Sequence, residues 1–143
     1  MLSAKSIEGR RMKKHLFILI LCMPLILISC GSSHTIIDLT MSDYKFTPDT
    51  ITTTAGEEVT LNLTNKGFVS HKFVIFKLGT TAGQSFGHED EKNIYWSFEV
   101  LPGHFDSAAF TVPSEPGEYF VSCGIQGHIE VGMVGKLIVV AKK

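Results

Sequence analysis

The chain has 143 residues, of which 44% are hydrophobic and 19% charged, and its formal net charge is −1. This length provides for one ordinary globular domain, and the composition is neither disordered nor disulfide-dense. The charge is unevenly divided. Residues 1–29 hold five Lys or Arg and one Glu, whereas residues 30–143 hold eight Lys or Arg and thirteen Asp or Glu. An acidic folded part argues against nucleic-acid binding.

The first 29 residues have the pattern of a signal peptide. Lys13 and Lys14 precede an apolar run from Leu16 to Ile28. A bilayer-spanning helix needs about 20 apolar residues, so the run is too short to span and fits a secretory signal instead. Met12 is a second candidate start.

The end of this run, Leu27-Ile28-Ser29-Cys30, resembles a bacterial lipobox, in which the cysteine becomes the lipidated N-terminus. We therefore expect an exported protein anchored by acyl chains on Cys30 at the bacterial cell envelope, facing the periplasm or the outside. Residues 30–34 would be the lipidated N-terminus and tether, and residues 35–143 the folded domain. The alternative is an ordinary signal peptide cleaved after Ser29, which leaves Cys30 as a free thiol.

Short segments of the folded part alternate apolar and polar residues, the period of a half-buried strand. Such strands at regular spacing predict an all-β fold, an antiparallel Greek-key β-sandwich of six to eight strands. In chain order the expected strands are Thr35–Leu39, Tyr44–Phe46, Asp49–Thr54, Val59–Thr64, His71–Lys77, Ala108–Val112, Tyr119–Cys123 and Val134–Val140.

Leu78–Lys92 does not follow this rhythm and is expected to be a surface excursion with one helical turn near Glu89–Asn93. Its acidic cluster, Glu89-Asp90-Glu91, is expected to be a solvated face.

The last part of the chain carries a set of soft metal donors. Cys123 ends an expected strand and shares a face with Val121 and Tyr119, so its sulfur should point into the sandwich. A glycine-containing loop with His128 and Met133 follows. Thiolate, imidazole and thioether suit copper, and two histidines, a cysteine and a weak axial methionine form a type 1 electron-transfer centre.

The second histidine must come from elsewhere in the chain. His71 opens an expected strand after the 67–70 loop and can therefore reach the same end of the sandwich. The alternatives are that Cys123 is a buried core thiol, Met133 a core side chain and His71 an ordinary strand residue. The histidines at 34, 88 and 104 are expected at the surface.

At these residues the chain resembles the cupredoxins, the type 1 blue copper proteins. The Cys-x4-His-x4-Met spacing is most similar to auracyanins and sulfocyanins and close to azurin, and the resemblance extends from about Thr35 to Val140. It implies one copper ion with His71, Cys123 and His128 as equatorial ligands and Met133 as the axial ligand. The sequence departs from the cupredoxin pattern at two positions. Lys72 stands where many relatives carry Asn, and Gln126 stands where many carry Pro.

The resemblance also implies a function. The protein would be a monomer that shuttles one electron between redox partners such as a cytochrome, an oxidase or a reductase, while lipid holds it at the membrane. Ile125, Ile129 and Val131 would surround the loop histidine with an apolar patch for brief docking.

The same donor residues are also found in proteins of two other functional classes. Copper oxidases and nitrite reductases place a histidine beside the cysteine, whereas Ser122 and Gly124 flank it here, so we expect a protein that is not an enzyme. The remaining alternative is a copper-binding, delivery or sensing lipoprotein on the same fold.

Overall fold

The computed structural model describes residues 34–143. The predicted signal peptide, Cys30 and nearly all of the tether therefore lie outside the described residues. Within residues 34–143, no helix combines the length and apolarity that crossing a bilayer requires.

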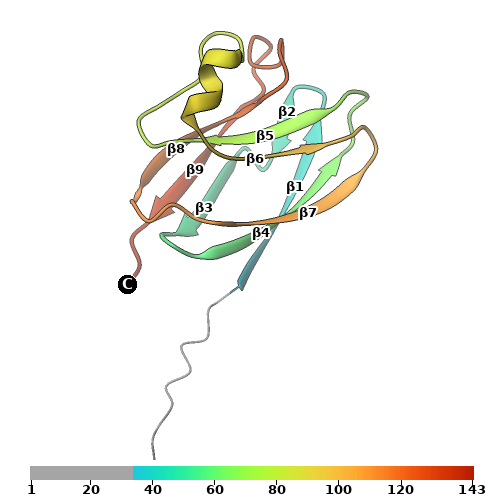
Figure 1. Ribbon diagram of the computed structural model, residues 1–143. Coiled ribbons are helices and arrows are strands. Elements are labelled where there is room, and N and C mark those ends of the chain that lie inside the picture. Colours follow the sequence, from blue (N-terminus) through green and yellow to red (C-terminus); the bar gives the residue numbers. More distant parts are fainter. Residues whose placement is uncertain (1–33) are drawn as a thin grey trace, which may run out of the picture. The chain divides into compact units, whose positions relative to one another are not determined.

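Nine strands of the described part form two sheets that pack as a sandwich (Figure 1). The first sheet has the order β2-β1-β4-β7 and consists of β1 (His34–Ser42), β2 (Lys45–Thr47), β4 (Glu58–Asn65) and β7 (Phe105–Thr111). The second has the order β3-β9-β8-β5-β6 and consists of β3 (Thr50–Thr54), β9 (Val134–Val140), β8 (Gly117–Cys123), β5 (His71–Phe76) and β6 (Ile94–Val100).

The predicted all-β sandwich is confirmed, with two differences. Both sheets are mixed rather than wholly antiparallel, because β1 pairs in parallel with β4 and β3 pairs in parallel with β9. Alternation marks a strand but carries no information on the direction of its neighbour. Strand β6 is additional to the predicted strands. Its residues are mostly half-buried without regular alternation, so the period-two signal is absent.

The core lies between the sheets and is filled by alternate residues of each strand. In β4, Val59, Leu61 and Leu63 are almost fully buried, as the alternation predicts. In β8 the inward set includes Val121 and Cys123, so the cysteine faces the interior as expected.

The 77–93 excursion covers the outer face of the second sheet and contains the 3-10 helix η1 (His88–Asn93), which confirms the predicted helical turn. Beneath it Phe76 is fully buried and packs against Phe86 and Phe120. The acidic cluster is only partly solvated, because Asp90 is 4% exposed and its carboxylate accepts hydrogen bonds from the Gly87 and Gly83 amides.

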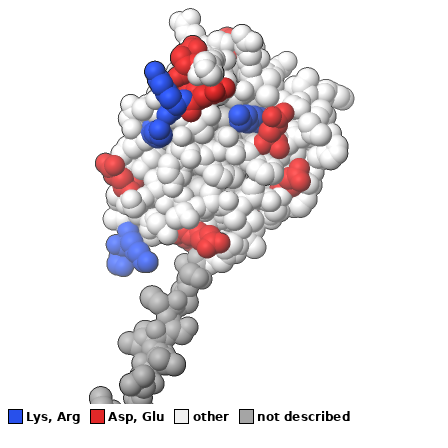
Figure 2. Space-filling view, in the orientation of Figure 1, with Lys and Arg blue, Asp and Glu red and all other residues white. Residues whose placement is uncertain are grey.

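Charge is sparse on the face shown in Figure 2. Acidic side chains gather over η1, whereas elsewhere the Lys, Asp and Glu side chains in view are scattered over an uncharged surface. A large surface of a single sign, of the kind that binds nucleic acid, is absent from this view.

Four connections meet at one end of the sandwich, which we call the loop end. They are the β1–β2 turn at 43–44, the β4–β5 loop at 66–70, the β6–β7 loop at 101–104 and the β8–β9 loop at 124–133. Strand register places them together, since Met41 pairs with Asn65, His71 with Val100 and Phe73 with Cys123.

Candidate metal centre

Three predicted ligands converge at the loop end. Nδ1 of His71 lies 3.2 Å from Nδ1 of His128, and Sγ of Cys123 lies 3.8 Å and 3.2 Å from these two nitrogens. All three side chains are buried, with His71 and Cys123 0% exposed and His128 7% exposed. Residues from β5, from the end of β8 and from the β8–β9 loop therefore present two ring nitrogens and one sulfur to a common point.

The β8–β9 loop holds its shape through its own backbone. Gly127 and Gly132 adopt positive φ angles of 90° and 91°, a conformation that favours glycine. The amide of His128 donates to the carbonyl of Ile125, which closes a turn just before the ring. The glycines of the predicted loop therefore allow the chain to turn back, so that His128 lies close to Cys123.

Met133 is tied to the other two residues of its motif. Its amide donates to the carbonyl of His128 at 2.9 Å, and its carbonyl accepts from the amide of Cys123 at 3.0 Å. Its side chain is fully buried and belongs to the same core cluster as Cys123. Backbone hydrogen bonds thus link Met133 to both Cys123 and His128, and they close the loop just before β9 begins.

The β4–β5 loop is held by Asn65, whose side chain is buried. Its Nδ2 donates to the carbonyls of Val69 and Val100, and its Oδ1 accepts from the amide of Gly67. These bonds fix the chain that leads into His71. The side chain of Lys72 makes no such bridge, but its carbonyl accepts from the amide of Gly124, which joins the two ligand segments through backbone.

The β1–β2 turn touches both histidines. Asp43 Oδ1 lies 3.5 Å from Nε2 of His71, on the opposite side of the ring from the cluster. The ring of Tyr44 meets the ring of His128 edge-on, with centroids 5.2 Å apart and an interplanar angle of 89°.

Burial governs the protonation of the cluster. Desolvation lowers the pKa of His71, and the neighbouring His128 lowers it further, while Asp43 opposes both effects. Desolvation also lowers the pKa of His128. It raises the pKa of Cys123, although the backbone amides of Lys72 and Ile125 donate to the sulfur and oppose the shift. Neutral imidazoles have a free lone pair for a metal, and the thiol releases its proton when a metal binds.

The donor set fits copper. Two imidazole nitrogens and one thiolate, with a buried methionine beside them, are the ligands of a type 1 site. Within residues 34–143 no other group of three His, Cys, Asp or Glu side chains is placed to hold a metal ion. The histidines at 34, 88 and 104 are exposed, as predicted.

Comparison with known proteins agrees with this geometry. Residues 16–139 match the cupredoxin-like domain family. The chain belongs to this family. As a cupredoxin, it has copper as its cofactor, and His71, Cys123, His128 and Met133 are arranged as a type 1 copper site.

The relatives of this cupredoxin include a copper-resistance protein and blue copper proteins. The chain is 36% identical over 109 residues to the copper-resistant cuproprotein CopI of Rubrivivax gelatinosus, a match that covers 69% of this chain and 62% of that protein. The cupredoxin chain thus spans somewhat less than two thirds of this relative.

The solved structures that share the fold include two auracyanins. The reduced auracyanin of Roseiflexus castenholzii has a TM-score of 0.61 and 25% identity, covering 77% of this chain and 99% of its own. The blue copper protein auracyanin A of Chloroflexus aurantiacus has a TM-score of 0.61 and 22% identity, covering 75% and 99%.

The predicted docking residues have unequal positions. Val131 is 56% exposed, whereas Ile125 and Ile129 are half-buried and Ile125 packs against the core. Sequence reasoning missed Asn65, Asp43 and Tyr44 as residues of the site. Asn65 directly follows the expected strand Val59–Thr64, and nothing in the sequence marks it as a residue of the site. Nothing local in the sequence places the β1–β2 turn beside the histidines.

Proposed function

We propose that this cupredoxin is a one-electron carrier. The observation that carries the proposal is the buried cluster of His71 Nδ1, His128 Nδ1 and Cys123 Sγ, held by backbone hydrogen bonds next to Met133. Bound copper would accept one electron from a reduced partner protein as Cu(II) becomes Cu(I), and would return it to an oxidised partner. A ligand set already assembled by the fold needs little rearrangement when the charge changes.

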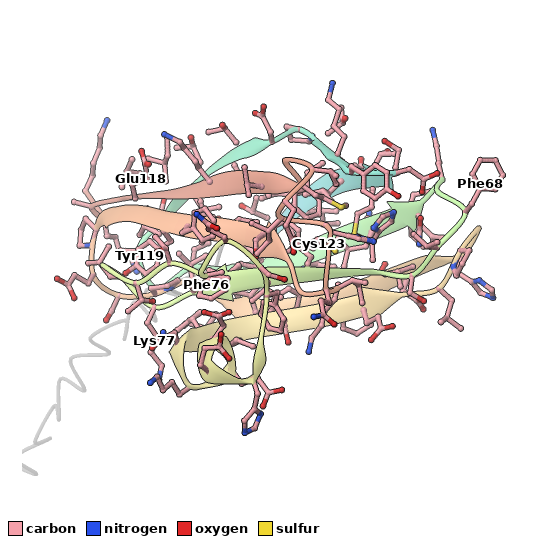
Figure 3. The ribbon with its side chains drawn as sticks, turned by 90° about the horizontal axis from the view of Figure 1, so that it is seen from above. Phe68, Phe76, Lys77, Glu118, Tyr119 and Cys123 are labelled. Atoms are coloured by element: carbon pink, nitrogen blue, oxygen red, sulfur yellow. The ribbon has the colours of Figure 1, made fainter. Side chains whose placement is uncertain are left out.

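Electrons would enter and leave through His128, because it is the one of the three converging ligands with any exposed surface. Apolar side chains gather around it at the loop end. Figure 3 shows Phe68 projecting away from the domain on the same side as Cys123, and it is 90% exposed. Together with the exposed side chains of Tyr44 and Val131 it offers apolar surface for brief docking of a redox protein.

We further propose that the protein is not an enzyme and that lipid anchors it to the cell envelope. Ser122 and Gly124 flank the cysteine, so no neighbouring histidine leads to a second catalytic metal. The lipobox-like Leu27-Ile28-Ser29-Cys30 supports the anchor. Labelling with radioactive palmitate in a bacterial host, which Cys30→Ser should abolish, tests the anchor directly.

The name of the relative CopI favours a second candidate, which is copper handling in resistance to the metal. The burial of the ligands argues for the carrier instead, since a delivery protein must release its ion. The two candidates are separated by copper retention. A carrier should keep its copper through repeated oxidation and reduction in the presence of a chelator, whereas a delivery protein should lose it in the reduced state.

The primary test is spectroscopic. Residues 31–143 with one equivalent of Cu(II) should give an intense sulfur-to-copper absorption band and the narrow copper hyperfine splitting of a type 1 site in EPR. Cys123→Ser should remove the band, because the thiolate is its origin. The exposed His104→Ser is the matched control and should leave the spectrum unchanged. A colourless wild type, or a normal-copper EPR spectrum, would reject the carrier.

A further inference from the structure

The carboxylate of Asp43, in the β1–β2 turn, lies next to Nε2 of His71, on the side of the ring that faces away from the ligand cluster. Both Nδ1 atoms of the histidine pair face the cysteine sulfur, so these nitrogens must be free of protons to bind a metal. A neutral imidazole that has no proton on Nδ1 has it on Nε2. Nε2 of His71 is fully buried, and the group that faces it is the carboxylate of Asp43, with Oδ1 at 3.5 Å.

The surroundings of this carboxylate hold it in place. The amide of Phe68 donates to the same Oδ1 at 3.0 Å. Gly67 packs against the pair so closely that an added Cβ would overlap Oδ1 of Asp43 and would come 2.7 Å from Nε2 of His71. The side chain of Asp43 is 34% exposed while His71 is 0% exposed, so the negative charge lies between solvent and the buried ring.

We propose that Asp43 is a positioning residue of the copper site. Its carboxylate accepts the Nε2 proton of His71, which keeps Nδ1 free for the metal and fixes the plane of the ring, and its charge favours the more positive Cu(II) state. Among the described residues Nε2 has no hydrogen-bond partner, and the charged group recorded beside it is the Asp43 carboxylate, at 3.5 Å. A carboxylate behind a metal-binding histidine commonly orients the ring and raises its basicity. The inference rests on the proposed function and adds to it the group that sets the redox poise.

Two substitutions separate charge from hydrogen bonding. Asp43→Asn removes the charge and keeps an acceptor oxygen, whereas Asp43→Ala removes both. Glu58→Gln is the matched control. It removes one exposed charge at the other end of β4, about 23 Å from Asn65 at roughly 3.3 Å per residue. Thermal melting of each metal-free variant, compared with wild type, establishes that it is folded.

The first readout is the ring itself in the metal-free protein. Long-range 1H–15N NMR spectra should show the proton of neutral His71 on Nε2 in wild type, Asp43→Asn and the control. In Asp43→Ala a measurable share should move to Nδ1. A wild-type ring with its proton on Nδ1, or an Asp43→Ala ring that is unchanged, overturns the inference whether or not copper binds.

The second readout is the copper-loaded protein. Both Asp43 variants should lower the ratio of Cu(II) to Cu(I) affinity about tenfold, which for one electron is a rise in potential of about 59 mV. The Glu58→Gln variant should stay close to wild type. Equal potentials in all variants overturn the inference while the type 1 spectrum of the wild type leaves the carrier function intact. A wild type without that spectrum rejects the carrier, and the NMR readout still decides the role of Asp43.

Discussion

At the scale of single residues, each histidine of the cluster has one neighbour that the sequence pattern does not mark. His71 has Asp43 behind its ring, and the ring of Tyr44 lies at a right angle to that of His128. The two neighbours are consecutive in the chain, so one turn sets the surroundings of both rings. The position of this turn has a backbone cost. Tyr44 has a φ angle of 66°, in the left-handed region that a residue with a side chain rarely adopts.

Replacement of Tyr44 separates its ring from its backbone. Tyr44→Ala removes the ring and keeps a Cβ in the left-handed region, whereas Tyr44→Gly removes both. We expect the Gly variant to be more stable than the Ala variant by about 1 kcal/mol, since glycine carries no penalty at this φ. Urea unfolding of the metal-free variants measures the difference. Equal stabilities would show that the backbone conformation is unstrained.

The same pair of variants tests whether the Tyr44 ring shields the site. Loss of the ring should admit water to His128, which stabilises the more charged Cu(II) site and lowers the potential in both variants alike. A potential that changes in one variant only would assign the effect to the backbone rather than to the ring.

At the scale of elements, the site is a meeting of loops that the two sheets bring together. The β8–β9 loop carries its own hydrogen bonds, but the β4–β5 loop depends on Asn65. This side chain bonds along its own loop and across to the carbonyl of Val100 at the end of β6. The buried side-chain amide of Asn65 therefore helps to hold the ligand loops together. The residue after His71 is Lys72, whose side chain makes no such bond.

Asn65→Ala should destabilise the metal-free domain by about 3 kcal/mol, because three backbone groups lose their partner and two of these hydrogen bonds are buried. Asn62→Ala is a matched control on the same strand. Its side chain bonds Asp38 and Ser107 on the solvent-facing side of the first sheet, so its loss should cost less than about 1 kcal/mol. Chemical unfolding followed by tryptophan fluorescence compares the two, and similar costs would contradict the role of Asn65.

The sequence predicts those parts of the site that lie in one local segment. Cys123, His128 and Met133 belong to a single strand and loop, so their spacing can be recognised in the sequence. The structure brings Cys123 and His128 together with His71 and buries Met133 in the same core cluster as Cys123. The second histidine was placed from its strand position and from the family resemblance. The β1–β2 turn was missed because its place depends on the parallel pairing of β1 with β4, and period-two alternation contains no information on that pairing.

At the scale of the whole molecule, the two ends of the sandwich differ in what they offer a partner. The loop end carries exposed apolar side chains next to the buried cluster, including Phe68 and Val131. Figure 3 places Phe68 and Cys123 on one side of the domain and Tyr119, Glu118 and Lys77 on the other. Electron transfer slows steeply with distance, so a partner that docks at the loop end would be favoured over one that docks elsewhere.

This asymmetry predicts the behaviour of the electron self-exchange reaction, which needs no knowledge of the natural partner. Two copies, one oxidised and one reduced, should exchange electrons fastest with their loop ends in contact. Phe68→Lys should therefore slow self-exchange about tenfold at low salt, since it sets like charges against each other in the encounter complex, and added salt should restore the rate. NMR line broadening of mixed oxidation states measures this rate.

Ile36→Lys is the matched control, because Ile36 is an exposed apolar residue of β1 whose register partner, Thr60, lies toward the other end of β4. It adds the same charge and should change self-exchange little. Neither variant should alter the absorption spectrum, since neither residue is among the converging ligands. Equal slowing by both substitutions would mean that net charge rather than the loop end governs the encounter, and the docking surface would then have to be sought on another face.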